Sequence, residues 1–333
     1  MNNILSHALL LLVKTRYFQF AILPMFSLVI PVFNEEQLID DLVSRVIAAV
    51  ESFAGDYEIL FVDDGSTDKT VEKLLIYRDK NKRIKIISLS KNFGHQAAFT
   101  AGLELSKGDI VAMMDGDLQD PPELLADMYR KIREQDYDII SGKRTGRKGH
   151  GHRNFYTFLF HLIFKNIAGL ENMENAGNFS MLTREALRAL LSLNEKVRYM
   201  PGLRSFIGFK QGSVEYVRED RMHGEPKMSL SKLFALANDA IFSFSRFPIR
   251  LCLYLGTIGT IVFMLAGIYV LVEKILGLAL LGWSSTLLSI YFLGSIQLIF
   301  LGIVGEYVFR IYKESQNRPI YFIKKIHEDS SNP

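Results

Sequence analysis

The sequence predicts an α/β domain with a mostly parallel sheet, followed by a hairpin of two membrane-spanning helices. In the first half of the chain, short runs of β-branched and aromatic residues alternate with helix-like stretches, which is the pattern of a doubly wound sheet. In the last third, the apolar runs Leu251–Val272 and Leu278–Val304 contain no charged residue. Each is longer than the roughly 20 residues that a helix needs to cross a bilayer.

The predicted strands share a high content of β-branched and aromatic residues and cover Phe26–Val32, Tyr57–Val62, Ile84–Leu89, Ile110–Met114 and Asp138–Ser141. The helices expected between them cover Glu35–Ser52, Lys69–Arg78, His95–Lys107 and Pro122–Gln135. In sheets of this kind, ligands bind beyond the carboxyl ends of the strands. The polar residues that follow the first four strands are therefore expected to converge on one acidic cleft.

The membrane hairpin is expected to have both flanks in the cytoplasm, because basic residues gather near its ends at Arg246, Arg250, Arg310, Lys313, Lys324 and Lys325. Gly282–Ser285 is expected to form the turn at the far interface, with Trp283 as its aromatic anchor. The alternative is a buried helical hairpin in a soluble protein. The length and the lack of charge of both runs disfavour it.

At 333 residues, the chain has room for one α/β domain and the hairpin, and its net charge of +3 gives no indication of nucleic-acid binding. The single cysteine, Cys252, excludes an intrachain disulfide. The expected parts are an N-terminal extension (1–25), the α/β domain (26–228), a juxtamembrane amphipathic helix (229–246), two transmembrane helices (247–310) and a cytoplasmic tail (311–333). Whether residues 1–24 are functional stays open, because Met25 is an alternative start.

Two carboxylates, Asp115 and Asp117, stand one residue apart directly after a predicted strand. A hard cation such as Mg²⁺ or Mn²⁺ prefers oxygen ligands and needs only one or two from the protein when it also binds a diphosphate. Asp117 is the first candidate ligand, with Gln119 offering a carbonyl oxygen. Asp115 is expected to contact either the metal or ribose hydroxyls.

Neighbouring acidic residues are expected to have structural roles. Asp120 is expected to cap a helix that starts at Pro121, with Glu123 closing the capping arrangement. In the earlier motif, Asp64 is expected to face a ligand, while Asp68 caps the following helix.

Three ordered motifs together resemble the GT-A, family 2 glycosyltransferases: Val29–Glu36, Val62–Ser66 and Asp115–Glu123. The resemblance covers roughly Phe26–Ser229 and is greatest to the membrane-bound polyprenyl-phosphate group, which includes dolichol-phosphate mannose synthase and bacterial undecaprenyl-phosphate glucosyltransferases. The two apolar runs match the bacterial branch. The resemblance implies a Rossmann-like GT-A domain that uses Mg²⁺ or Mn²⁺.

The resemblance also implies roles for individual residues. It implies that the nucleotide is bound by Pro31, Glu35, Asp64 and Asp115. It also implies that the metal and the diphosphate are bound by Asp115, Asp117 and Gln119. The segment Arg221–Ser229 resembles a phosphate-gripping motif of the family, with Pro226 in place of the usual serine. The acceptor phosphate would be held by Arg144, Arg153, Arg221 and Lys227, of which Arg221 and Lys227 would act with Asp117 in catalysis.

One departure concerns Asn178, where many relatives carry Asp; Asn178 is expected to lie near the donor sugar and, with Asn175, to mark a different sugar. The expected reaction still proceeds, because a phosphate monoester with a second pKa of about 6 is largely dianionic at neutral pH and needs no general base. The expected function is transfer of one sugar, with inversion, from a nucleotide-diphosphate sugar to polyprenyl (undecaprenyl) phosphate for cell-envelope glycan modification. The catalytic domain would face the cytoplasm at the bacterial inner membrane.

Two alternatives remain. A processive polysaccharide synthase shares the fold and the metal motif, but its Gln-x-x-Arg-Trp segment is absent because the only tryptophan is Trp283. A non-catalytic, membrane-anchored nucleotide-binding module would have no need for a metal site opposite a basic phosphate clamp. The sugar, the base, the acceptor chain length, the pathway and the oligomeric state stay open.

Overall fold

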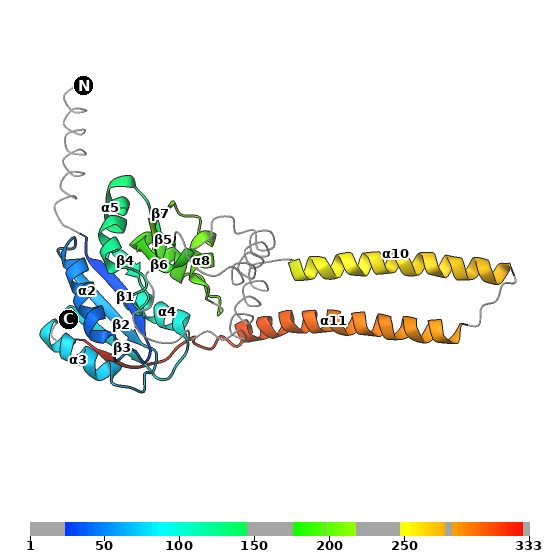
Figure 1. Ribbon diagram of the computed structural model, residues 1–333, viewed down its shortest axis with the longest axis horizontal. Helices are drawn as coiled ribbons and strands as arrows, with labels where there is room; N and C mark the ends of the chain where they lie inside the picture. The colour runs from blue at the N-terminus through cyan, green and yellow to red at the C-terminus, as the bar shows by residue number, and fades with distance from the viewer. Residues whose placement is uncertain (1–23, 145–175, 197, 218–246, 277–281, 329–333) are drawn as a thin grey trace, which may run out of the picture.

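The computed structural model describes residues 24–144, 176–196, 198–217, 247–276 and 282–328. Within these residues, one eight-stranded sheet has the order β7-β5-β6-β4-β1-β2-β3-β8 (Figure 1). Its centre consists of β3 (Ile84–Leu89), β2 (Tyr57–Asp63), β1 (Phe26–Val32) and β4 (Ile110–Met113), which are parallel to one another. The expected α/β domain with a mostly parallel sheet is confirmed.

The outer strands are β5 (Ile139–Arg144), β6 (Ala176–Thr183), β7 (Gln211–Tyr216) and β8 (Ile323–His327). Strand β6 is antiparallel to both β4 and β5, and β7 is parallel to β5. Strand β8 comes from the end of the chain and pairs antiparallel with β3. The parallel centre therefore has an antiparallel strand on each side.

Helices cover both faces of the sheet. They are α2 (Ile39–Glu51), α3 (Thr70–Lys80), α4 (His95–Leu105), α5 (Leu125–Gln135), α7 (Arg184–Leu191) and α8 (Met200–Phe206), with a short 3-10 helix η1 (Pro122–Leu124) before α5. Because side chains alternate along a strand, Leu28 and Ile30 of β1 pack with α2 and α5, whereas Val29 packs on the other face with α4. These two apolar clusters fix the positions of the strand ends.

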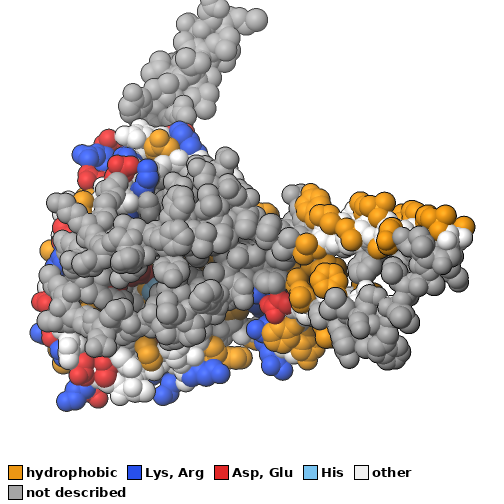
Figure 2. Space-filling model, turned by 45° about the vertical axis from the view of Figure 1, so that its right-hand side comes forward, with side chains coloured by type: hydrophobic (Ala, Val, Ile, Leu, Met, Phe, Trp, Pro, Cys, Tyr) orange, Lys and Arg blue, Asp and Glu red, His pale blue; other side chains and the backbone are white. Residues whose placement is uncertain are grey.

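Two long helices project from the α/β domain and lie side by side, α10 (Phe247–Ile275) and α11 (Trp283–Ser315) (Figure 1). Where its side chains are described, this arm is largely apolar (Figure 2), and many of these side chains are exposed, including Tyr254, Ile258, Leu298 and Leu301. By length and composition, one segment in the described part of the chain, Phe292–Ser315, could cross a membrane; Tyr254–Tyr269 is a shorter apolar stretch.

The structure differs from expectation at two helix starts. Residues Trp283–Ser285 form the first turn of α11 rather than a loop, because the Thr286 amide bonds the Gly282 carbonyl at 3.0 Å. Helix α2 begins at Ile39 rather than Glu35, because the residues before it form a turn in which the Leu38 amide donates to the Glu35 carbonyl at 2.9 Å. The amides of Glu35 and Glu36 bond to Thr70 at the start of α3 and to Asp68. The expected extension and juxtamembrane helix fall on residues 1–23 and 229–246, outside the described residues.

Candidate active site

The carboxyl ends of β1, β2 and β4 lie next to one another, because these three strands are parallel neighbours. Pro31 is buried in β1 and lies beside Gly116 of the loop after β4. A Cβ atom at Gly116 would lie 2.8 Å from the Pro31 carbonyl oxygen. Only glycine therefore lets the loop that carries Asp115 and Asp117 approach β1 so closely.

The loops after β1 and β2 are joined by hydrogen bonds. The Asn34 side chain accepts from the Thr67 amide at 2.8 Å, and the Glu35 amide donates to the Thr70 hydroxyl at 2.9 Å. The Glu35 side chain is half-buried. These contacts join the two loops that carry Glu35 and Asp64, two of the expected nucleotide-binding residues.

Asp64 uses both carboxylate oxygens to hold the start of α4. It accepts from the Phe93 amide at 2.7 Å and from the Gly94 amide at 3.0 Å, and it is 4% exposed. Burial raises the pKa of Asp64, against the effect of these two hydrogen bonds. The structure thus gives Asp64 a positioning role for α4, and its expected contact with the nucleotide stays a prediction.

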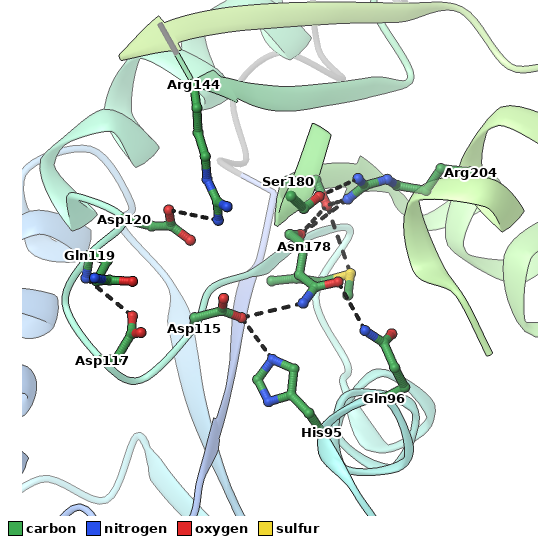
Figure 3. Close-up of polar contacts among 12 residues, drawn as sticks. His95, Gln96, Asp115, Asp117, Gln119, Asp120, Arg144, Asn178, Ser180 and Arg204 are labelled. Carbon is green, nitrogen blue, oxygen red and sulfur yellow. Dashed lines mark hydrogen bonds and ion pairs between the residues drawn. The ribbon is translucent and has the colours of Figure 1, made fainter. Parts of the chain in front are cut away.

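Four side chains from α4, β6 and the loop after β4 meet next to the part of that loop that carries Asp117 and Gln119 (Figure 3). His95 Nε2 and Asp115 Oδ1 lie 2.8 Å apart, and the Asn178 amide donates to the same Asp115 oxygen at 3.5 Å. The Gln96 amide donates to Asn178 Oδ1 at 3.2 Å. Asp115 and Asn178, both expected site residues, are thus connected to the first turn of α4.

His95 and Asp115 favour each other's charged form. Burial opposes protonation of His95, but the hydrogen bond and charge of Asp115, with the charges of Asp117 and Asp64, raise the pKa of the imidazole. Burial likewise opposes ionisation of Asp115, but His95, with Arg144 and Asn178, holds the pKa of that carboxyl below its usual value. Three acidic residues therefore act on His95, and they come from two of the four strand ends that were predicted to converge.

Asp117 and Gln119 lie on the loop that follows β4, on the side away from His95 (Figure 3). The backbone amide of Gln119 donates to Asp117 Oδ1 at 3.2 Å, and Leu118 between them has a positive φ of 56°. Among the described residues, no group of three or more His, Cys, Asp or Glu side chains could hold a metal ion. The donors present fit a Mg²⁺ or Mn²⁺ ion that takes one or two protein oxygens and completes its shell with phosphate and water.

Asp120 has a different role from the one expected. Its buried carboxylate accepts from the Tyr216 hydroxyl and pairs with Arg144 at 3.4 Å, while Pro121 is the N-cap of η1 without a side-chain capping bond. Glu123 pairs with Arg45 of α2 at 3.0 Å. The capping prediction was wrong, because strands β5 and β7 bring a cation and a hydroxyl to Asp120.

Arg144, an expected acceptor-phosphate residue, lies between Asp120 and Asp115 (Figure 3). Its guanidinium donates to the Tyr216 hydroxyl at 3.1 Å, and 28% of its side chain is exposed. Burial opposes the charge, but Asp120 and the Tyr216 hydrogen bond raise the pKa of Arg144. Arg144 is thus a fixed cation beside the acidic loop.

Arg204 of α8 supports the strand segment around Asn178. It is 1% exposed and donates to the Gly177 carbonyl at 2.6 Å, to the Asn178 carbonyl at 3.1 Å and to the Ser180 hydroxyl. Burial lowers the pKa of Arg204 to about 10. This guanidinium fixes the strand segment from which Asn178 reaches Asp115.

Sequence reasoning missed His95, Gln96 and Arg204. The run Asn92–Gly94 was recognised as a strand end, and His95 follows it directly, so a polar residue at the start of that helix was the available signal. No sequence pattern marks Arg204. The predicted residues Arg153, Arg221 and Lys227, with Asn175, lie outside the described residues.

Comparisons with known proteins identify the family. The family model described as glycosyl transferase family 2 matches residues 27–191. The chain is similar to the uncharacterized glycosyltransferase YkcC of Bacillus subtilis, with 37% identity over 90% of this chain and 93% of that protein. It is also similar to the bactoprenol glucosyl transferase of Shigella phage SfII, with 36% identity over 90% of this chain and 98% of the relative.

Among solved structures, glucosyl-3-phosphoglycerate synthase from Mycobacterium tuberculosis, in complex with Mn²⁺, UDP and glucosyl-3-phosphoglycerate, matches 66% of this chain and 77% of its own, with 16% identity and a TM-score of 0.47. The two relatives are identical to this chain at 36–37% of aligned positions along nearly their whole length. On the family model and these two relatives, the chain belongs to the family 2 glycosyltransferases.

Proposed function

We propose that this protein transfers one sugar from a nucleotide-diphosphate sugar to a polyprenyl phosphate, of which undecaprenyl phosphate is the bacterial form, for modification of cell-envelope glycans. The observation that carries the proposal is the similarity to the bactoprenol glucosyl transferase of Shigella phage SfII, which extends over 90% of this chain and 98% of that enzyme. A match over only the α/β domain would have left the acceptor open. Here it extends into the two long helices as well.

The donor is proposed to bind at the carboxyl ends of β1, β2 and β4. Pro31, Glu35 and Asp64 would contact the nucleoside, Asp115 the ribose or diphosphate, and Asn178 the sugar. A Mg²⁺ or Mn²⁺ ion held by Asp117 and Gln119 would stabilise the negative charge of the leaving diphosphate. Two observations support this assignment. The Asp117 carboxylate is partly exposed, and the backbone amide of Gln119 donates to it and holds it in place.

The acceptor phosphate is proposed to bind opposite the donor, between Arg144, Arg153, Arg221 and Lys227. Arg144 is already fixed beside Asp115, so an anion bound there would lie close to the donor site. A dianionic phosphate attacks the anomeric carbon directly, without a general base. Direct displacement inverts the anomeric centre.

The hairpin α10–α11 is proposed to cross the inner membrane twice, with the catalytic domain on the cytoplasmic side. The exposed apolar side chains of both helices support it, because such a surface is stable in lipid and not in water. Arg310 and Lys313 near the end of α11 fit the excess of basic residues found on the cytoplasmic side. This placement would hold the site at the membrane surface.

The test is mass spectrometry of lipid extracted after the purified full chain is incubated with Mn²⁺, undecaprenyl phosphate and a panel of nucleotide sugars. The parent protein is expected to give a lipid phosphate that carries one sugar with inverted configuration. Asp117→Asn is expected to lose the product, and Asp79→Asn, an exposed carboxylate of α3, is the matched control. A product of several sugars, retained configuration, or no product from any donor would contradict the proposal.

A further inference from the structure

The end of the chain returns from α11 to the α/β domain. Helix α11 ends at Ser315, and Asn317 has a positive φ of 46°, which turns the chain back. Strand β8 then pairs with the edge of β3, with Ile326 opposite Ile87 and His327 opposite Ile86 (Figure 1). We refer to Gln316–Phe322, which joins α11 to β8, as the coupling segment.

The coupling segment contacts the last turn of α4 and the loop that leads into it from β3. The Tyr321 hydroxyl donates to the Glu104 carboxylate in the last turn of α4. In the loop before α4, the Ser90 amide donates to the Phe322 carbonyl at 2.8 Å, and the ring centroids of Phe93 and Phe322 lie 6.1 Å apart. Burial and the Glu104 hydrogen bond raise the pKa of Tyr321.

Helix α4 delivers its first two side chains to the candidate active site. His95 contacts Asp115 at 2.8 Å and Gln96 donates to Asn178 at 3.2 Å. The amides just before them are held by Asp64. A displacement of α4 would therefore reach three of the predicted donor-site residues.

The end of α11 is also fixed to the α/β domain by a second set of contacts. The Lys196 amide donates to Glu314 at 2.8 Å, and the Lys196 ammonium group contacts Asn317 at 3.2 Å. Burial lowers the pKa of the neighbouring Arg198, against the charges of Glu104, Glu195 and Glu314. Acidic groups of α4 and α11 thus act on one cation.

We propose that the coupling segment positions α4 relative to the membrane hairpin, so that the donor site meets the phosphate of a lipid embedded in the bilayer. This inference rests on the proposed function. Reacting atoms need to come within about 3–3.5 Å, and a misplacement of about 1 Å costs up to about a hundredfold in rate. A bilayer fixes the acceptor phosphate relative to α11, whereas an acceptor in solution adjusts freely.

The test compares two acceptors with the full-length protein in nanodiscs: undecaprenyl phosphate in the bilayer, and a water-soluble phosphate of two isoprene units. One variant carries a Gly-Ser-Gly-Ser insertion between Arg318 and Pro319, which lengthens the segment but keeps Tyr321 and β8. A second variant is Tyr321→Phe. Tyr77→Phe is the matched control, because Tyr77 donates to Asp40 at 2.8 Å between α2 and α3, away from α4.

The insertion is expected to lower kcat/KM for the bilayer acceptor about tenfold, with less than a twofold change for the soluble acceptor and for the donor KM. Tyr321→Phe is expected to shift the same ratio in the same direction by about threefold, and Tyr77→Phe not at all. Equal losses with both acceptors, or no loss with either, would overturn the inference. An inactive parent protein would instead count against the proposed function.

Discussion

His95 lies among three acidic residues, so its charge state links the stability of the site to pH. Its pKa is raised, and a raised pKa means that the folded state binds the proton more tightly than the unfolded chain. The stabilisation is therefore complete below the unfolded pKa of about 6.5 and disappears as the pH rises through the higher folded value.

We therefore predict that His95→Gln, studied without metal and nucleotide, unfolds at a lower temperature than the parent at pH 5.5. The difference should shrink as the pH rises through the raised pKa of His95 and vanish above it. Thermal unfolding of both proteins across this range is the measurement. His7→Gln, in the N-terminal extension, serves as a control. A constant difference at all pH values would show that His95 acts through packing alone.

Replacing Arg204 is expected to lower the stability of the fold. Arg204→Met removes the donor of the buried Gly177 and Asn178 carbonyls and of the Ser180 hydroxyl. The Asn178 carbonyl keeps its bond from the Ser180 hydroxyl at 2.9 Å, and each group that is left unsatisfied costs about 1–3 kcal/mol. The melting temperature should fall by several degrees. Arg188→Met, on the exposed face of α7, should change it little. Equal melting temperatures for the two variants would refute this support of β6.

The positions of candidate site residues could be predicted from the sequence where a motif directly follows a predicted strand. Asp115, Asp117 and Gln119 follow a recognisable strand, and the structure places them on one loop. Gln96 and Arg204 could not be predicted in this way, because their roles depend on which side chains the fold brings beside Asn178. Asp120 shows the same limit, since its partners Arg144 and Tyr216 are 24 and 96 residues away.

At the scale of elements, the loops after β2 and β3 meet at Gly65. This residue has a φ of 77°, and a Cβ atom there would lie 2.7 Å from the Lys91 carbonyl carbon. Gly208 has a similar φ of 70° but no atom within 4 Å of such a Cβ. A side chain at either position would have a strained backbone, but only a side chain at Gly65 would also clash with a neighbouring loop.

Gly208→Ala is therefore predicted to cost about 1–2 kcal/mol from backbone conformation alone. Gly65→Ala should cost more, because the Lys91 backbone has to move, and it should also weaken nucleotide binding through the neighbouring Asp64. Denaturant unfolding and nucleotide titration of both variants provide the comparison. Similar values for the two alanine variants would mean that the loops do not pack as described.

Helices and strands could largely be predicted where the local sequence pattern determines their bounds. Two strands, Phe26–Val32 and Ile84–Leu89, have the predicted bounds. The start of α2 was misplaced because the residues before it form a turn, with the Leu38 amide on the Glu35 carbonyl, and hydrogen-bond to the start of α3. Strand β8 was missed because its two isoleucines, Ile323 and Ile326, stand three residues apart among basic residues and give no strand-like alternation. Its pairing with β3 also spans more than 230 residues of sequence.

At the scale of the whole molecule, the proposed hairpin makes a prediction about sidedness. Two spans of α10 and α11 would put the connection between them on the outer side of the inner membrane and the α/β domain on the inner side. Cys252 is the only cysteine, so Cys252→Ser gives a background without thiols. Single cysteines can then report each side: Ser285→Cys at the start of α11, and Lys82→Cys on the exposed surface before β3.

A membrane-impermeant maleimide should label Ser285→Cys in intact spheroplasts and Lys82→Cys only in inside-out vesicles. The physical reason is that neither the polar α/β domain nor the reagent crosses the bilayer, whereas the apolar arm does. Product formation by both variants is the control for correct folding. Labelling of both positions from the same side would mean that α10 and α11 do not form a pair of spans, and the acceptor would then have to reach the site by another route.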